Sequence, residues 1–294
     1  MCSSDLLRPT VAFAMGRTAW PSRVLACMLG APFVYASVEA GQETAPGQLP
    51  VEVLAGLYRA HSLSGATIVH GLLGNPALQS LGPWLHNRAF RRLGLDAVYL
   101  PLETSRPEAV VAMLPRARLR GLSVTAPHKL AMAGQCHRLS PEASATGVVN
   151  TLTYEAHGLV VGHNTDVHGV IGALRRAGLG QVGKGERTAA VLGTGGAARA
   201  GAFALQRLGY DVMLLGRSLE PARAFASHHG MRLGSLQARL LEELNPAVVV
   251  HATPVGGVGR DLEERLVVIL GKLLTETESI REGIGKTEIG RAHV

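Results

Sequence analysis

The feature that most constrains the fold is a glycine-rich turn between a strand pattern and a helix pattern. Residues 188–193 read TAAVLG, and Gly193 to Arg199 read GTGGAAR. Such a turn brings backbone N–H groups and a helix N-terminus up to a pyrophosphate, because glycine has no β-carbon to block the approach. The spacing departs from GxGxxG, and a tight strand-to-helix turn without a ligand has a similar composition. The expected nucleotide contacts here are Gly193, Gly195, Gly196 and Ala197.

The next apolar strand pattern indicates which dinucleotide would bind. It covers residues 210–216 and ends at Arg217 and Ser218, with no acidic residue to hold the ribose 2′-hydroxyl of NAD. Because an arginine forms forked hydrogen bonds to a phosphate, this pattern favours NADP over NAD. Arg199 and Arg223 could add charge, but we interpret both as lying on solvated helix faces.

Strand and helix patterns alternate in two series, which predicts an α/β fold with a mainly parallel sheet in each. The first series has strands over 67–73, 97–101 and 121–125, and helices over 83–93 and 107–114. The second follows a helix over 166–177 and has strands over 188–193, 210–216 and 247–253, with helices between them. The 294 residues are enough for two domains at about 150 residues each.

The segment before these series is too small to hold a core of its own. We expect strands over 11–15 and 33–37, a helix over 22–29 and a helix that starts after Pro50. After Gly257 the alternation is lost, and only an amphipathic helix over 261–274 is expected.

Composition narrows the classes of partner. The net charge is +7, but no run of five Lys or Arg occurs and aromatic residues make up 4%, which favours small anionic ligands over nucleic acid. No apolar run approaches the 18 or so residues of a membrane span, so no membrane partner is expected. The three cysteines have no CxxC spacing, so we expect no disulfide framework, no metal site and a cytoplasmic location. The oligomeric state cannot be predicted from this sequence.

Six motifs between Gly71 and Gly257, taken in order, resemble shikimate dehydrogenase. The resemblance implies a substrate-binding lobe, a Rossmann-type NADP-binding lobe, and the NADP-dependent reduction of 3-dehydroshikimate to shikimate. Quinate dehydrogenase, with the same catalytic pair, is the alternative. The motifs are GLLGNPALQSLGPWLHN, GLSVTAPHK, GVVNTL, GHNTD, GTGGAARA and HATPVGG.

The same resemblance implies roles for particular residues. Lys129 and Asp166 match the catalytic pair, although by residue type alone they would be a surface lysine and a helix N-cap. Gly82 stands where many members carry a second serine facing the substrate carboxylate, a loss that we expect to cost about 1 kcal/mol or more in binding if no other group replaces the donor. Ser80, Thr125 and Asn150 match substrate-binding positions, with turn and cap chemistry as the alternative, and Thr253 of HATPVGG matches a cofactor position.

Upstream, three motifs resemble the last two βα units of type I 3-dehydroquinate dehydratase, a TIM barrel. The order of the two resemblances is that of the bifunctional dehydratase/dehydrogenase enzymes. The Schiff-base lysine and its histidine have no counterpart here, and two of eight βα units cannot close a barrel, so we expect no dehydratase activity. The motifs are MGRTAWPSRVL, GAPFVYAS and TAPGQLP, and the matching residues are Arg23, Thr44 and Gln48.

These resemblances predict a fragment with four regions. Residues 2–6 (CSSDL) and 289–294 (IGRAHV) can both be back-translated into a common sequencing adapter and its reverse complement, which indicates truncation at both ends. Two ordinary polar termini are the alternative reading. A truncated chain leaves a further alternative for function, a non-catalytic fragment that at most binds NADP. The expected regions are a dehydratase remnant (1–60), a substrate-binding domain (66–165), an incomplete NADP-binding Rossmann domain (166–258) and a non-native tail (259–294).

Overall fold

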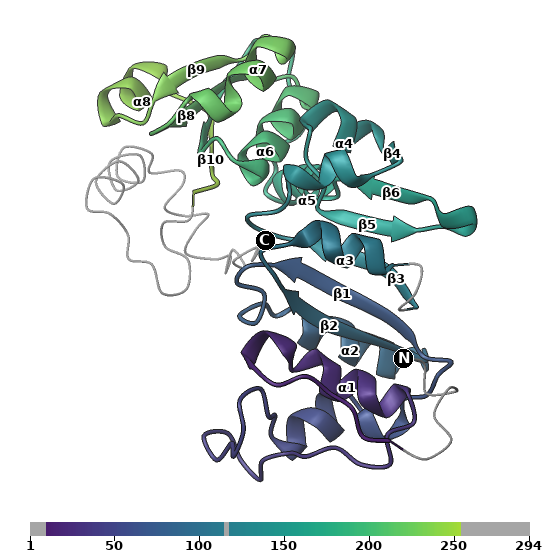
Figure 1. Ribbon diagram of the computed structural model, residues 1–294. Coiled ribbons are helices and arrows are strands. Elements are labelled where there is room, and N and C mark those ends of the chain that lie inside the picture. Colours follow the sequence, from purple (N-terminus) through teal and green to yellow (C-terminus); the bar gives the residue numbers. More distant parts are fainter. Residues whose placement is uncertain (1–9, 115–117, 254–294) are drawn as a thin grey trace. The chain divides into compact units, whose positions relative to one another are not determined.

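The computed structural model describes residues 10–114 and 118–253 (Figure 1). The chain divides into two compact units, one of Met1–Leu139 with Val149–Gly162 and one of Ser140–Val148 with His163–Val294. Each unit has a sheet with helices packed on it, which confirms the predicted α/β class. The tail expected over 259–294 and the helix expected over 261–274 lie outside the described residues.

The N-terminal unit is built on a six-stranded sheet in the order β2-β1-β3-β5-β6-β4. β1 pairs in parallel with β2 and β3, but β5 runs antiparallel to β3, so the sheet is mixed. The sequence predicted β1 to β3 but none of β4 to β6, which are short. Its strands are β1 (Ile68–Gly74), β2 (Ala97–Glu103), β3 (Leu119–Val124), β4 (Arg138–Leu139), β5 (Thr151–Tyr154) and β6 (Val160–His163).

Helix α2 is fixed to this sheet by a buried asparagine. The side-chain amide of Asn87 donates to the backbone oxygens of Pro83 and Tyr99, both at 2.8 Å, and its oxygen accepts the Tyr99 N–H at 2.9 Å. Asn87 is only 3% exposed, and these three bonds satisfy the polar groups of its side chain. The helical elements of this unit are η2 (Arg17–Ala19), α1 (Pro21–Met28), the π-helical η3 (Val53–Leu57), η4 (Ala60–Ser62), α2 (Gly82–Arg92), α3 (Pro107–Met113), η5 (Ala131–Gln135) and η6 (Ala156–Gly158).

The two strands expected over 11–15 and 33–37 are wrong. Within the described ranges these stretches are irregular, and their only ladder contact is a single parallel bridge between Ser37 and Pro50. A strand needs a neighbouring strand for its N–H and C=O groups, and the β-type pattern alone does not supply one. The helix expected over 22–29 is confirmed as α1, and a helical segment follows Pro50 as predicted.

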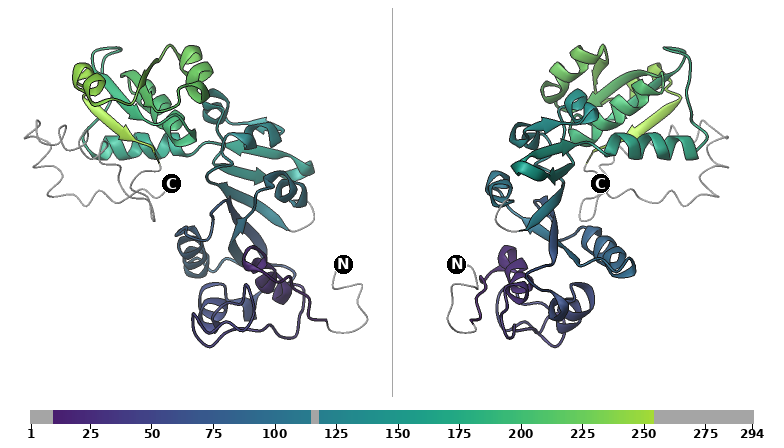
Figure 2. Two further views of the ribbon diagram at one scale, coloured as in Figure 1. Left: turned by 60° about the vertical axis from the view of Figure 1, so that its left-hand side comes forward. Right: turned by 90° about the vertical axis from the view of Figure 1, so that its right-hand side faces the viewer.

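The C-terminal unit holds a four-stranded parallel sheet in the order β10-β7-β8-β9 (Figure 2). β9 and α8 were not predicted, whereas the other strands and α5 to α7 match the second predicted series. The elements are α4 (Pro141–Thr146), α5 (Asp166–Arg176), β7 (Thr188–Leu192), α6 (Gly196–Arg207), β8 (Asp211–Gly216), α7 (Glu220–His229), β9 (Arg232–Ser235), α8 (Ala238–Leu244) and β10 (Val248–His251).

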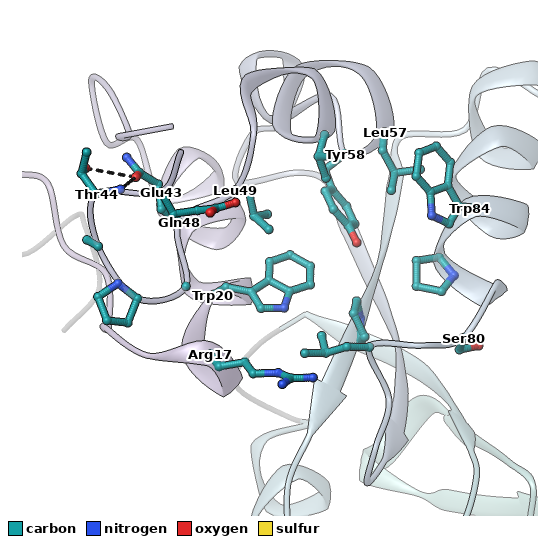
Figure 3. Close-up of a pocket in the computed structure, with 17 residues that line it drawn as sticks. Arg17, Trp20, Glu43, Thr44, Gln48, Leu49, Leu57, Tyr58, Ser80 and Trp84 are labelled. Atoms are coloured by element: carbon teal, nitrogen blue, oxygen red, sulfur yellow. Dashed lines mark hydrogen bonds between the residues drawn. The ribbon is translucent and has the colours of Figure 1, made fainter. Parts of the chain in front are cut away.

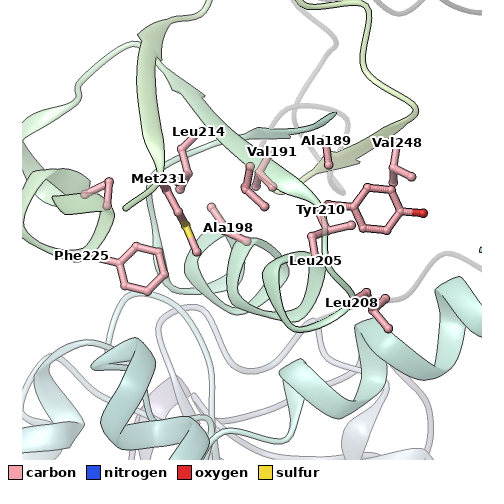
Figure 4. Packing of buried hydrophobic residues seen from close by; sticks show 14 residues of the cluster. Ala189, Val191, Ala198, Leu205, Leu208, Tyr210, Leu214, Phe225, Met231 and Val248 are labelled. Carbon is pink, nitrogen blue, oxygen red and sulfur yellow. The ribbon is translucent and has the colours of Figure 1, made fainter. Parts of the chain in front are cut away.

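Both faces of this sheet are covered, which explains why its strands are apolar throughout. Ala189 and Val191 of β7 pack into a cluster with α6 and α7 (Figure 4), and the alternate residues Ala190 and Leu192 pack into a second cluster with α8. Because successive side chains of a strand point to opposite faces, the run TAAVL contributes to two cores at once.

Candidate functional site

The predicted glycine turn lies between β7 and α6, and its first two glycines differ in what surrounds them. Gly193 has φ 126°, and a Cβ there would lie 2.8 Å from the backbone oxygen of Ala252. A Cβ at Gly195 would meet no described atom within 4 Å. The second glycine therefore borders space that no described residue fills, at the N-terminus of α6, where backbone N–H groups can receive a phosphate. The turn fits a dinucleotide pyrophosphate.

Two further loops adjoin this turn at the carboxyl edge of the sheet. The Gly193 N–H donates to Leu215 O at 2.8 Å, and a Cβ on Gly216 would lie 2.6 Å from Thr194 Cγ2, so the exposed Arg217 and Ser218 follow a residue in contact with the turn. From β10, the Ala252 N–H donates to Leu192 O at 2.8 Å, which brings Thr253 to the same edge. The predicted cofactor residues thus come together, as expected for the carboxyl ends of parallel strands.

A histidine beside this edge contacts one of the predicted residues. His251 ends β10, and its Nε2 lies 2.7 Å from Thr253 Oγ1, a hydrogen-bond distance. Partial desolvation lowers the pKa of His251, which favours its neutral form.

Our interpretation of Arg199 as part of a solvated helix face is wrong. Its guanidinium donates to Thr146 O at 3.4 Å and to Pro221 O, and it lies 5.6 Å from the Phe225 ring. Burial lowers the pKa of Arg199. This side chain holds the α4 segment and the start of α7 against α6 instead of facing solvent. Arg223, by contrast, is exposed and pairs with Glu220 at 2.9 Å on the surface of α7.

The predicted substrate residues of the N-terminal unit also share one edge of its sheet. The Thr125 N–H donates to Leu73 O at 2.9 Å, which places the end of β3 beside the end of β1. The Val124 N–H donates to Asn150 O at 2.6 Å, and Asn150 leads into the antiparallel β5. Ser80 lies in the loop that leaves β1. The structure therefore brings three loops together at the carboxyl ends of β1 and β3.

Lys129 lies on the same edge and is buried, with 7% of its surface exposed. The alternative reading as a surface lysine is therefore wrong. Its backbone oxygen accepts the Val149 N–H at 2.9 Å, and the preceding His128 is 6% exposed, with Nε2 2.8 Å from Thr104 O. Because a buried lysine is rare unless its charge is used or paired, the position favours a functional role.

Asp166, the other member of the predicted pair, belongs to the C-terminal unit. It is the first residue of α5 and is partly buried, and the N-cap position is Thr165. The N-cap reading of Asp166 is therefore wrong by one residue. A carboxylate in the first turn is still favoured by the positive end of the helix dipole.

One polar residue on the edge of the N-terminal sheet was missed by the sequence reasoning. The Glu103 carboxylate accepts the N–H groups of Ala77 and Leu78 at 2.8 and 3.4 Å, which holds the loop that carries Ser80. Its place at the carboxyl end of a predicted strand was the available signal.

The residues assigned to the dehydratase remnant do not form one site. Arg23 is 1% exposed, lies 4.3 Å from the Phe13 ring, and has a lowered pKa because of its burial. The Gln48 amide oxygen accepts the Thr44 N–H and hydroxyl at 2.7 and 3.1 Å, which closes the 44–48 loop on itself. Thr44 and Gln48 line a pocket of about 710 Å³ together with Ser80, and Arg23 is not among the residues that line it.

Comparisons with known proteins bear on this arrangement. The family described as the shikimate dehydrogenase substrate binding domain matches residues 72–152, and type I 3-dehydroquinase matches residues 1–64. The shikimate dehydrogenase (NADP(+)) of Acidiphilium cryptum is 39% identical over 201 residues, which cover 68% of this chain and 71% of that enzyme. The chain belongs to the shikimate dehydrogenase family.

Two further proteins show how much of the chain and of its relatives the similarity covers. The bifunctional 3-dehydroquinate dehydratase/shikimate dehydrogenase of Arabidopsis thaliana is 30% identical over 87% of this chain, and the chain spans 44% of that enzyme. The crystal structure of the Thermus thermophilus shikimate 5-dehydrogenase in complex with NADP(H) and shikimate matches with a TM-score of 0.55 and 35% identity, over 65% of this chain and 70% of that one. The resemblance to bifunctional enzymes of this order is confirmed.

The structure also places Gly82, the position where the resemblance leads us to expect a second serine. The Gly82 N–H donates to Ser80 Oγ at 3.0 Å, so the Ser80 hydroxyl oxygen caps the start of α2 while its proton remains available to a ligand. A Cβ at position 82 would lie 3.2 Å from Ser80 Oγ and 3.5 Å from the Tyr99 ring. A serine side chain at position 82 would thus lie directly beside Ser80.

Proposed function

We propose that this chain catalyses the NADP-dependent reduction of 3-dehydroshikimate to shikimate. The observation that carries the proposal is the buried Lys129 on the same sheet edge as Ser80, Thr125 and Asn150. Hydroxyl and amide groups suit a polyhydroxylated carboxylate, and a lysine amine suits a carbonyl that becomes an alkoxide.

The chemistry assigns separate tasks to the two predicted catalytic residues. When bound, NADPH supplies the hydride to the C3 carbonyl carbon. The Lys129 ammonium stabilises the negative charge that develops on the carbonyl oxygen, and a proton reaches that oxygen from the Lys129/Asp166 pair. The Asp166 carboxylate accepts a hydrogen bond from the neighbouring substrate hydroxyl.

Cofactor binding is assigned to the edge of the C-terminal sheet. Gly193, Gly195, Gly196 and Ala197 form the pyrophosphate turn, and Thr253 lies beside it. Arg217 and Ser218 bind the 2′-phosphate, because a guanidinium can form two charge-assisted hydrogen bonds to it. The open space in front of Gly195 supports this assignment.

The proposed organisation follows the two resemblances. Residues 1–60 derive from a type I dehydratase, 66–165 form the substrate-binding domain, 166–258 form the NADP-binding domain, and 259–294 are a non-native tail. None of the helices in the described ranges combines the length and hydropathy needed to cross a bilayer. The proposed location is the cytoplasm, and the proposed partners are small molecules.

The test is shikimate-dependent reduction of NADP+, followed at 340 nm, in parallel with quinate and with NAD+. The proposal expects the highest kcat/KM for shikimate with NADP+. A higher value for quinate with NAD+ would assign the chain to quinate dehydrogenase. NADP+ binding by calorimetry without turnover of either substrate would support the non-catalytic fragment instead.

A further inference from the structure

A pocket of about 710 Å³ in the N-terminal unit is lined mostly by residues that the proposed reaction does not use (Figure 3). It lies between the segment around η2 and η3 and the start of α2, and its volume is within the range of small-molecule sites. Neither Lys129 nor Thr125 lines it, and Ser80 is the only predicted substrate residue of the dehydrogenase that does.

Two buried polar side chains line this pocket without a protein partner. Trp20 is 5% exposed and Tyr58 is 4% exposed, and their rings contact each other with centroids 5.2 Å apart. Within residues 10–114 and 118–253, neither the indole N–H of Trp20 nor the hydroxyl of Tyr58 has a hydrogen-bond partner, and both atoms keep some surface exposed to solvent. In the view of Figure 3 the Tyr58 hydroxyl projects into the pocket between Trp20 and Trp84. Both donors are therefore open to a hydrogen-bond acceptor on a ligand in the pocket.

The charged and aromatic side chains that line the pocket indicate which kind of ligand it would bind. Arg17 lines the pocket and has no ion-pair partner in the described part of the chain. Trp20, Tyr58 and Trp84 present aromatic rings, and Leu49 and Leu57 add apolar surface. Glu43 also lines the pocket, and its carboxylate accepts the Gly41 N–H at 3.1 Å. A flat ring matches the aromatic walls, and an anionic oxygen group matches the three donors.

We infer that this pocket binds a planar aromatic carboxylate, at a site that shares only Ser80 with the proposed substrate residues. The ring lies against the Trp20, Tyr58 and Trp84 side chains. The carboxylate accepts hydrogen bonds from Tyr58 and Trp20 and pairs with the Arg17 guanidinium. Glu43 opposes this binding by repulsion, so the two charged residues have opposite and testable effects.

The first experiment uses the chain's own reporters. The chain contains only two tryptophans, Trp20 and Trp84, and both line the pocket. Titration with benzoate, with excitation at 295 nm, is expected to change their emission with a Kd of about 1 mM, as is usual for a ligand of this size. Benzylamine, with the same ring and the opposite charge, is expected to bind at least about tenfold more weakly.

The second experiment tests whether the charges of Arg17 and Glu43 act on binding directly, and not through a general effect on the fold. Arg17→Gln is expected to weaken benzoate binding about tenfold, Glu43→Gln to strengthen it, and Tyr58→Phe to weaken it by about fivefold while keeping the ring. Arg92→Gln is the matched control, because Arg92 is exposed at the end of α2 and does not line the pocket. It is expected to leave the benzoate Kd unchanged.

Several results would overturn the inference. They are no saturable response to benzoate up to 20 mM, tighter binding of benzylamine than of benzoate, or equal affinities in the Arg17→Gln and Arg92→Gln variants. Lys129→Ala is expected to leave the benzoate response intact, so loss of dehydrogenase activity without loss of this response counts against the proposed function alone. A missing benzoate response in an active enzyme counts against this inference alone.

Discussion

Lys129 is the residue on which the proposed chemistry most depends. Replacing it with alanine removes the charge that stabilises the developing alkoxide, so kcat for shikimate oxidation is expected to fall about 100-fold or more with little change in NADP+ affinity. Steady-state kinetics and calorimetric titration with NADP+ measure the two quantities. Near-normal turnover would remove Lys129 from the reaction.

Arg217 decides which dinucleotide is preferred. Arg217→Ala is expected to weaken NADP+ binding by about tenfold or more, because charge-assisted hydrogen bonds to the 2′-phosphate are lost, and to change NAD+ binding much less. Arg223→Ala is the control, since Arg223 is exposed and pairs with Glu220 on α7. Equal losses for NADP+ and NAD+ would contradict the assignment.

At the scale of elements, two glycines of the turn between β7 and α6 are expected to have different roles, Gly193 in stability and Gly195 in cofactor binding. Gly193→Ala places a Cβ at positive φ and 2.8 Å from Ala252 O, and it is expected to destabilise the chain by about 1–3 kcal/mol. Gly195→Ala meets no described atom, so it is expected to keep stability but weaken NADP+ binding. Urea unfolding and calorimetry distinguish them, and two equally destabilised variants would contradict the role given to Gly195.

Helix α4 provides a pH-dependent contribution to stability. Glu142 ends 3.1 Å from Arg207 of α6, and a backbone hydrogen bond, His168 and Arg207 lower its pKa from the usual 4.5. A lowered folded-state pKa stabilises the fold above the unfolded value, and this contribution is lost as pH falls through the folded value. Glu142→Gln is expected to lower the free energy of unfolding at pH 7, and the difference from the parent is expected to shrink as pH falls below about 4.5. A pH-independent difference would contradict this origin.

For the whole molecule, two units with separate cores are expected to respond differently to the cofactor. The proposed NADP-binding residues all lie in the C-terminal unit. NADP+ at 100 times its Kd is expected to stabilise that unit by about 2.7 kcal/mol and leave the other unit unchanged. Hydrogen exchange read separately from β7 and β1 measures this. Equal protection of both strands would show that the units unfold as one.

Much of the α/β pattern was determined by the sequence itself. The runs that form β1, β7 and β8 are apolar because both faces of those strands are covered, and the residues between them carry helical periodicity. The glycine turn and the absence of an acidic residue after β8 were equally visible, because backbone geometry at a phosphate site demands particular residue types. Short strands such as β4 and β9 carry too few residues for a periodic signal.

Only the tertiary structure decided which side chains face water. Lys129 and Arg199 have the composition of surface residues, yet both are withdrawn from solvent by segments distant in the chain. The apparent strands over 11–15 and 33–37 have the right side chains but no neighbouring strand in the described ranges. Local sequence determines backbone preference and periodicity, whereas burial and strand pairing depend on contacts between residues far apart in the chain, which a single sequence does not encode locally.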